Sequence, residues 1–156
     1  MGLFDFVKIC LFSEVNGVVT LNGKPVPDVE VVRTMRMGHN NIYTDKTTTD
    51  NQGHYRFAAR FTHSIRKIAP VEPLIFQRMV FVYQSKEYLG WETDKRNYQI
   101  NGELDVAINL VCELTNESRV RVGPRHRGID GICTGNGIRE ISPRARDGCE
   151  ARAVRH

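Results

Sequence analysis

Apolar and polar residues alternate with a period of two along much of the chain, and clusters of glycine, proline, asparagine and aspartate separate the alternating runs. Such runs are typical of half-buried β-strands, because successive side chains of a strand point to opposite faces of a sheet. The runs that predict strands are residues 14–21, 29–37, 42–50, 54–61, 77–84, 87–95 and 105–114. The pattern therefore predicts an all-β fold, as a single antiparallel β-sandwich of about seven strands.

Two turn segments give the clearest local signals. Asn22 and Gly23 supply the positive φ of a tight turn, and Pro25 and Pro27 exclude a central strand immediately after it. Residues 50–53, with the sequence Asp-Asn-Gln-Gly, form a second turn that leads into an aromatic strand. These turns specify the order and register of strands and carry no chemistry of their own.

The chain has 156 residues, which is enough for one well-buried core but short for two domains. Its formal net charge of +4 is unevenly placed, because residues 1–118 contain 13 Lys/Arg and 14 Asp/Glu, whereas residues 119–156 contain 9 Arg and 4 Asp/Glu. We therefore predict a sandwich domain over residues 1–134 and a basic, loosely ordered, Arg-rich tail over residues 135–156. The nearly neutral folded part predicts no nucleic-acid partner, since nucleic-acid-binding proteins concentrate cations on a structured face.

The four cysteines include no C-x-x-C pair, and the five histidines are not spaced as zinc ligands. Cys112 lies in an apolar run, so a buried free thiol is the favoured interpretation, and a disulfide with Cys133 in an oxidising compartment is the alternative. Asp45, Asp50 and Asn51 have the oxygen donors that calcium prefers, but the turn itself explains their presence. We therefore expect no metal and no cofactor.

No segment of the sequence reaches the roughly 18 apolar residues that a membrane-spanning helix needs. The first residues are apolar, but they contain Asp5 and Lys8, lack a basic n-region and offer no small-residue cleavage site. The sequence therefore predicts a cytoplasmic protein without a membrane span. A periplasmic location is the alternative if the true start lies upstream.

The sequence contains no motif that indicates catalysis. It has no G-x-S-x-G segment for a serine nucleophile, and the glycine-rich residues 135–137 are not followed by a lysine, serine or threonine that would bind phosphate. Cys133 and His126 could form a thiol pair, but a cysteine that contributes to packing is the favoured interpretation. We therefore predict a protein that is not an enzyme.

Three segments have the composition of protein-binding surfaces, which are rich in arginine, methionine and aromatic residues. They are the hairpin of residues 33–43, the proline-containing insertion of residues 65–76 and the aromatic turn of residues 88–98. Tyr88 and Trp91 have a second interpretation as core residues, which is the favoured one for Trp91. The predicted protein-binding residues are Arg33, Arg36, His39, Tyr43, Arg66, Lys67, Tyr88 and Trp91.

The two turn segments also resemble a known class of β-sandwich. Residues 15–31, V-x-G-x-V-x-x-N-G-K-P-V-P-D-V-x-V, followed by residues 49–57, T-D-x-x-G-x-Y-x-F, are similar to the carboxypeptidase regulatory-like or transthyretin-like modules. The matching positions are Gly17, Gly23, Pro25, Val26, Asp28, Val29, Thr49, Asp50, Gly53, Tyr55 and Phe57. This resemblance implies a sandwich of the transthyretin-like type.

The body of the chain, from its first residues through INGELDVAINLVCELT to GICT, also looks like a family of small bacterial proteins of unassigned function. That family is associated with gene neighbourhoods of type VI secretion. The resemblance implies an immunity protein that binds a cognate antibacterial effector, a secreted toxin, and neutralises it by steric occlusion. We expect the protein to be a monomer or a small homo-oligomer.

Two other functions stay open. One is an accessory or adhesion-type regulatory domain, because regulatory-like modules take part in assembly or carbohydrate attachment within larger chains. The other is a transthyretin-like hydrolase of 5-hydroxyisourate; those enzymes use a His/Arg cluster and end in Y-R-G-S. The nearest segment here, HRGID at residues 126–130, lacks both the tyrosine and the serine.

Overall fold

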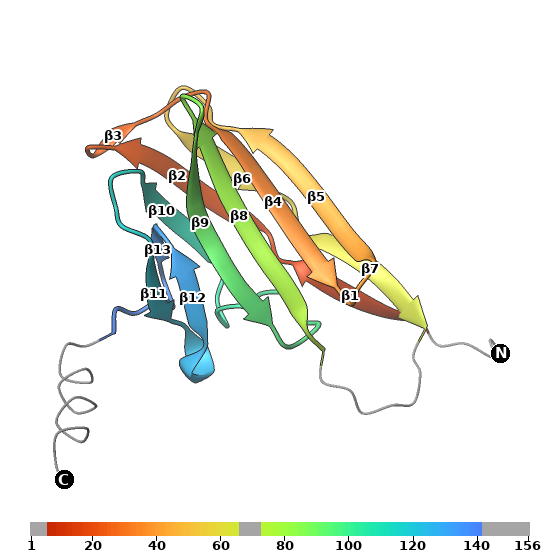
Figure 1. Ribbon diagram of the computed structural model, residues 1–156. Helices are drawn as coiled ribbons and strands as arrows, with labels where there is room; N and C mark the ends of the chain where they lie inside the picture. The colour runs from red at the N-terminus through yellow and green to blue at the C-terminus, as the bar shows by residue number, and fades with distance from the viewer. Residues whose placement is uncertain (1–5, 66–72, 142–156) are drawn as a thin grey trace, which may run out of the picture.

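The computed structural model describes residues 6–65 and 73–141 and confirms the predicted all-β sandwich (Figure 1). These residues form thirteen strands and one short 3-10 turn. The larger sheet has the strand order β11-β12-β9-β8-β4-β5. The second sheet has the order β13-β10-β2-β3, and β6 also pairs with β2. The six-stranded sheet consists of β4 (Glu30–Met37), β5 (Asn41–Thr48), β8 (Ile75–Tyr83), β9 (Lys86–Lys95), β11 (Arg119–Val122) and β12 (Gly128–Gly131). The five-stranded sheet consists of β2 (Val15–Leu21), β3 (Lys24–Pro25), β6 (His54–Phe57), β10 (Ile108–Glu113) and β13 (Cys133–Gly135).

A third sheet pairs β1 (Phe6–Phe12) with β7 (Arg60–Ile65). β1 leads into β2 through residues 13–14, and β6 leads into β7 through residues 58–59, so each chain segment bends between two strands. The predicted strand over residues 54–61 is therefore two strands. The described residues contain more strands than the predicted seven because of these bends and because β3, β11, β12 and β13 are too short to show an alternating pattern.

One strand pair departs from the predicted antiparallel arrangement. β10 runs parallel to β2, with Ile108 opposite Val15, whereas the other strand pairs of the described residues are antiparallel. β10 enters the five-stranded sheet after a connection of residues 96–107 that comes from β9 in the opposite sheet. β2 and β10 are not consecutive in the chain, so no hairpin turn between them imposes an antiparallel direction.

The hydrophobic core lies between the two larger sheets. Tyr55 of β6 contacts Phe81 of β8 with ring centroids 5.6 Å apart, and Phe12 of β1 contacts Trp91 of β9 at 6.3 Å. A Cβ atom at Gly17 would lie 2.3 Å from the ring of Tyr55. Only glycine therefore fits beneath this tyrosine.

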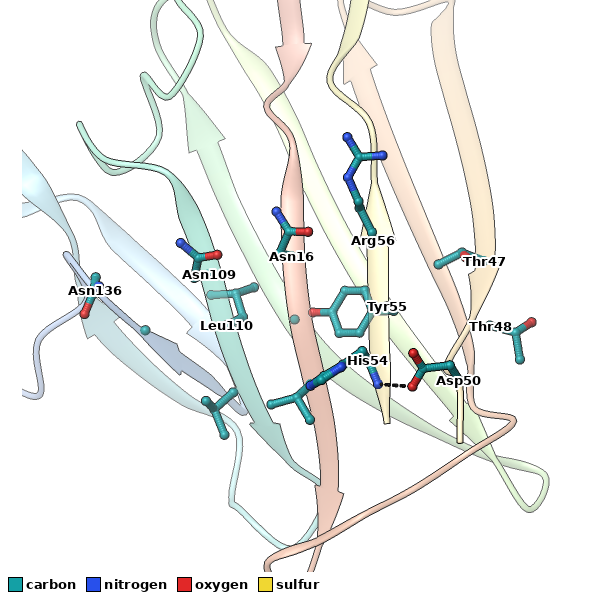
Figure 2. A pocket seen from close by; sticks show the side chains of 14 residues that line it. Asn16, Thr47, Thr48, Asp50, His54, Tyr55, Arg56, Asn109, Leu110 and Asn136 are labelled. Atoms are coloured by element: carbon teal, nitrogen blue, oxygen red, sulfur yellow. Dashed lines mark hydrogen bonds between the residues drawn. The ribbon is translucent and has the colours of Figure 1, made fainter. Parts of the chain in front are cut away.

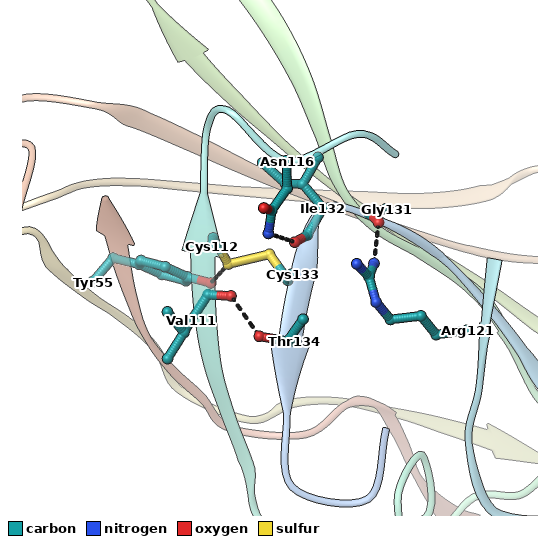
Figure 3. Close-up of a disulfide and its surroundings, with 9 residues drawn as sticks. All are labelled: Tyr55, Val111, Cys112, Asn116, Arg121, Gly131, Ile132, Cys133 and Thr134. Carbon is teal, nitrogen blue, oxygen red and sulfur yellow. Dashed lines mark hydrogen bonds between the residues drawn. A yellow bond between two sulfur atoms is a disulfide. The ribbon is translucent and has the colours of Figure 1, made fainter. Parts of the chain in front are cut away.

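A disulfide links Cys112 of β10 to Cys133 of β13, which lie directly opposite each other in the sheet (Figure 3). The hydroxyl of Tyr55 lies 3.5 Å from the sulfur of Cys112. The predicted free thiol at Cys112 is therefore wrong, because the three-residue strand β13, which the sequence pattern does not reveal, returns Cys133 to the neighbouring position. Cys10 is a buried free thiol, and Cys149 lies outside the described residues.

The described chain stays in contact with the sandwich beyond β13. Ile138 packs against the core, and the backbones of Arg139 and Val122 form two hydrogen bonds with each other. Arg121, which is buried, forms an ion pair with Glu140. These contacts lie beyond the predicted domain boundary at residue 134. The rest of the predicted tail, residues 142–156, lies outside the described residues.

Glu113 at the end of β10 holds the predicted Asn22-Gly23 turn in place. Its carboxylate accepts hydrogen bonds from the backbone N–H groups of Asn22 (2.6 Å) and Gly23 (3.0 Å) and from the hydroxyls of Thr20 and Thr115. Burial alone would raise the pKa of Glu113, but the hydrogen bonds from Thr20, Thr115 and the turn lower the pKa to about 2. Asn22 and Gly23 both have positive φ angles, as the sequence predicts.

Replacing both disulfide cysteines, Cys112→Ala with Cys133→Ala, is expected to lower the free energy of unfolding by about 3 kcal/mol, since the bond closes a loop with a sequence separation of 21. Urea denaturation measures this difference. Reductant should destabilise the wild type by a similar amount and leave the double variant unchanged. Equal stability of the oxidised wild type and the double variant would contradict the pairing.

Replacement of the turn-binding carboxylate, Glu113→Gln, should change how stability depends on pH. The folded pKa of about 2 lies below the ordinary value of 4.5, so the carboxylate stabilises the fold fully above about pH 4.5 and loses this contribution as the pH falls towards 2. The stability difference between wild type and Glu113→Gln should therefore narrow over this range in denaturation curves. A difference that stays constant down to about pH 2 would refute the role of the ionised carboxylate.

Candidate functional site

One end of the six-stranded sheet exposes large apolar side chains beside arginine. Strand register places Ile42, Arg36, Phe76 and Asp94 in one row across β5, β4, β8 and β9, all on the outer face of the sheet. Ile42 is 61% exposed and Phe76 is 39% exposed. The guanidinium of Arg36 lies 4.6 Å from the ring centroid of Phe76, which is the distance of a cation–π contact.

The next row of the same face adds charged side chains. Thr34, Arg78 and Glu92 lie opposite one another, and Arg78 forms an exposed ion pair with Glu92 at 3.4 Å. The two rows line an open groove with a volume of about 410 Å³. We call this region the Arg36–Phe76 surface, and it consists of Arg36, Ile42, Phe76, Arg78, Glu92 and Asp94.

Only some of the predicted protein-binding residues are exposed on the described structure. Arg36 belongs to the Arg36–Phe76 surface, and His39 is exposed in the turn between β4 and β5. Tyr43 is half-buried on the inner side of β5, where Arg60 lies 5.5 Å from its ring and its hydroxyl is 3.4 Å from Thr62. Tyr88 is half-buried, and the ammonium of Lys86 lies over its ring. Arg66 and Lys67 lie outside the described residues.

Arg33 and Trp91 are core residues. The predicted role of Arg33 in protein binding is therefore wrong, and for Trp91 the favoured interpretation as a core residue is confirmed over the protein-binding one. Arg33 is 2% exposed, and its guanidinium lies between the rings of Phe12 and Phe57 and pairs with Asp45 at 2.6 Å. Burial lowers the pKa of Arg33, whereas Asp45 raises it. Trp91 is 0% exposed. Both residues occupy inward-facing positions of their strands, where no partner protein reaches them.

A second groove lies on the outer face of the five-stranded sheet, and Figure 2 shows its polar lining. Its volume is about 760 Å³, and Asn16 of β2 lies directly opposite Asn109 of β10 at its centre. Arg56 is paired with Glu14 at 3.0 Å, and the carboxylate of Asp50 accepts backbone hydrogen bonds from its own turn. This groove offers amide and hydroxyl groups, and it contains none of the predicted site residues.

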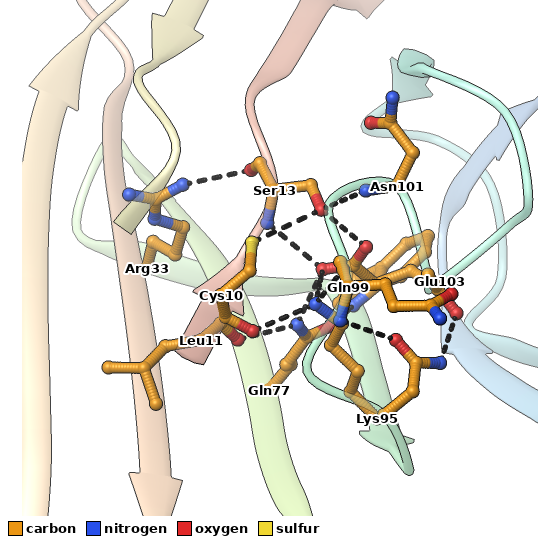
Figure 4. Close-up of polar contacts among 12 residues, drawn as sticks. Cys10, Leu11, Ser13, Arg33, Gln77, Lys95, Gln99, Asn101 and Glu103 are labelled. Carbon is orange, nitrogen blue, oxygen red and sulfur yellow. Dashed lines mark hydrogen bonds and ion pairs between the residues drawn. The ribbon is translucent and has the colours of Figure 1, made fainter. Parts of the chain in front are cut away.

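A buried polar cluster joins the β1–β2 bend to the long connection before β10 (Figure 4). The backbone N–H and the hydroxyl of Ser13 donate to the carboxylate of Glu103 at 2.9 and 2.6 Å. Lys95 lies 3.6 Å from Glu103 and donates to the backbone carbonyls of Cys10 and Gln99. Gln77 donates to Glu103 and to the carbonyl of Leu11.

This cluster contains a serine, a cysteine, a lysine and a carboxylate, which are residue types that catalysis uses. Ser13 and Lys95 are 0% exposed and Glu103 is 2% exposed, so a substrate has no access to them. The cluster therefore acts as a structural joint. The sequence analysis did not predict this cluster, because Ser13 and Glu103 are far apart in the chain. Its one trace in the sequence is that two inward positions of β8 and β9 hold polar residues, Gln77 and Lys95.

Among the described residues, no group of three or more histidine, cysteine, aspartate or glutamate side chains is arranged to hold a metal ion. Within the same residues, no helix has the length and apolar character needed to cross a membrane.

The variant Glu103→Gln should lower the free energy of unfolding by about 3–5 kcal/mol, because it leaves the Lys95 ammonium buried without its anionic partner. Urea denaturation provides the measurement. The matched control is Glu117→Gln, which removes an exposed ion pair with Arg119 and should change stability by less than about 1 kcal/mol. Similar small effects of the two variants would show that the buried pair does not hold the connection in place.

A family model described as Domain of unknown function (DUF6795) matches residues 15–117. No curated protein and no solved structure matches the chain. The matched residues include β4, β5, β8 and β9, the four strands that carry the Arg36–Phe76 surface. The chain belongs to the DUF6795 family.

Proposed function

We propose that the protein is a non-enzymatic binding module that contacts a partner protein through the Arg36–Phe76 surface. The observation that carries this proposal is the exposure of Ile42 and Phe76 beside the stacked guanidinium of Arg36. Arginine and aromatic side chains dominate binding energies at protein interfaces, and full burial of one large apolar side chain contributes about 1.5–3 kcal/mol. Arg78, Glu92 and Asp94 around the two apolar side chains supply a polar rim.

The specific partner that we propose is a cognate secreted antibacterial effector, which makes the protein an immunity protein. The resemblance to small bacterial proteins of type VI secretion neighbourhoods supports this partner. Steric occlusion needs a binding surface that keeps its shape when the partner binds. The Arg36–Phe76 surface meets this need, because it lies on strands that pack over a close-packed core. The Cys112–Cys133 disulfide supports the periplasmic alternative over the cytoplasm, because disulfides persist in oxidising compartments.

A second candidate function is an accessory or adhesion-type domain. The groove around Asn16 and Asn109 favours it, since asparagine is uncommon in strands and its amide both donates and accepts hydrogen bonds. Sugar hydroxyl groups require both kinds of partner. Carbohydrate binding that depends on Asn109, in a chain that forms no complex with the effector, would favour this function over the first.

The protein should form a 1:1 complex with the effector encoded beside it, and calorimetric titration measures the affinity. Arg36→Glu and Phe76→Ala should each weaken binding by roughly 30-fold or more, because each removes a central contact. Lys24→Glu is the matched control, since it makes the same change of charge as Arg36→Glu at an exposed residue of the other sheet, and it should bind as the wild type does.

Two results would remove this proposal. A titration without heat or saturation would exclude the effector as the partner. Equal loss of affinity in Arg36→Glu and Lys24→Glu would show that overall charge, and not the Arg36–Phe76 surface, determines binding.

A further inference from the structure

The turn between β11 and β12 has an unusual combination of backbone and side chains. Arg125 and His126 have φ angles of 57° and 56°, the left-handed region that glycine and asparagine normally occupy in such turns. The turn is closed at its base, because the backbone N–H of Gly123 donates to the carbonyl of Arg127 at 2.8 Å. The hydroxyl of Thr93 on β9 also donates to the carbonyl of Gly128 at 2.8 Å, which fixes the turn against the six-stranded sheet.

Backbone strain of this kind persists where the surrounding structure holds it, and it gathers at functional sites. The turn lies at the same end of the molecule as the end of β9 (Figure 1). The next residue after β9 is Arg96. Arg96 and Arg125 both lie close enough to Arg127 for their charges to act on its guanidinium.

Arg127 has a buried nitrogen, Nη1, without a hydrogen-bond acceptor in the part of the chain that the structure describes. A buried N–H group of a charged side chain without an acceptor costs free energy, and native proteins rarely leave one in that state. Burial lowers the pKa of Arg127, and the positive charges of Arg125 and Arg96 lower it further, whereas Asp105 and Asp94 act in the opposite direction with smaller effect. Arg127 therefore lies among other cations while one of its own buried N–H groups has no acceptor among the described residues.

The ion pair of Arg125 with Asp105 does not prevent Arg125 from binding a further anion. Arg125 contacts Asp105 at 3.4 Å, and both side chains are well exposed, at 65% and 48%. Water screens an exposed pair of this kind, so Arg125 is able to bind a second acceptor at little cost. Guanidinium groups present planar pairs of N–H donors that match the oxygen atoms of phosphate and carboxylate.

We propose that Arg96, Arg125 and Arg127 form an oxyanion-binding site at the β11–β12 turn, which takes a phosphate or carboxylate group. The bound oxygen atoms supply the acceptor that Arg127 Nη1 lacks, and the exposed guanidinium of Arg125 is able to reach the same group. This site is separate from the Arg36–Phe76 surface, and the inference does not depend on the proposed protein partner.

Titration of the isotope-labelled full chain with sodium phosphate, followed by NMR, tests the site. Sodium acetate forms a second arm, and sodium chloride keeps the ionic strength constant. We expect saturable shifts of the backbone amides of residues 123–128 and of Arg96 with phosphate. Saturation by phosphate alone would assign the site to phosphate groups, and saturation by both anions would extend it to carboxylates.

Two variants locate the binding. Arg127→Gln and Arg125→Gln should each weaken phosphate binding by about tenfold or more, and Arg125 is exposed enough for its replacement to leave the fold intact. Arg56→Gln, an exposed arginine of the other sheet, is the control and should bind phosphate as the wild type does. Shifts that do not saturate, or that Arg56→Gln reduces as strongly as Arg125→Gln, would overturn the proposal.

Discussion

The buried ion pair of Lys95 with Glu103 is the contact on which the rest of the sandwich depends. Glu103 lies in the connection that carries the chain from the six-stranded sheet to β10, and Ser13 ties it to the bend between β1 and β2. One carboxylate thus joins the two sheets at the point where the chain crosses between them. Charges without access to water must be paired and hydrogen-bonded, so separating Lys95 from Glu103 would leave a buried charge without a partner.

Because the core is buried, binding to other molecules takes place on the outer faces of the two larger sheets. These two faces expose different kinds of side chain. The face of the five-stranded sheet is polar, with Asn16 and Asn109 at its centre. The face of the six-stranded sheet places Phe76 and Ile42 beside Arg36 at one end. Exposed apolar side chains with a charged border are typical of surfaces that bind proteins, whereas scattered amides are typical of hydrogen-bonding sites for small polar ligands.

Strand alternation and turn residues were sufficient to predict the all-β sandwich, because each records a local property of the chain. The same alternation places Arg33 on the face of Val29 and Val31, but a charged residue there is interpreted as exposed until its partner Asp45 is known. The Cys112–Cys133 disulfide was only the alternative interpretation and the Ser13–Glu103 contact was not predicted, since both depend on which distant strands meet. Arg36 was predicted as a binding residue from composition, and Ile42 and Phe76 lay within the predicted segments 33–43 and 65–76. That the three form one surface follows only from the register of β4 with β5 and β8.

Hydrogen exchange of the chain, alone and mixed with the proposed effector partner, tests most directly whether and where the two proteins bind. Contact with the Arg36–Phe76 surface predicts slower exchange on binding for the end of β4, the β4–β5 turn and the start of β8. The strands of the five-stranded sheet, including those that carry Asn16 and Asn109, should exchange at the same rate in both states. Protection of that sheet, with β4 and β8 unchanged, would contradict the account.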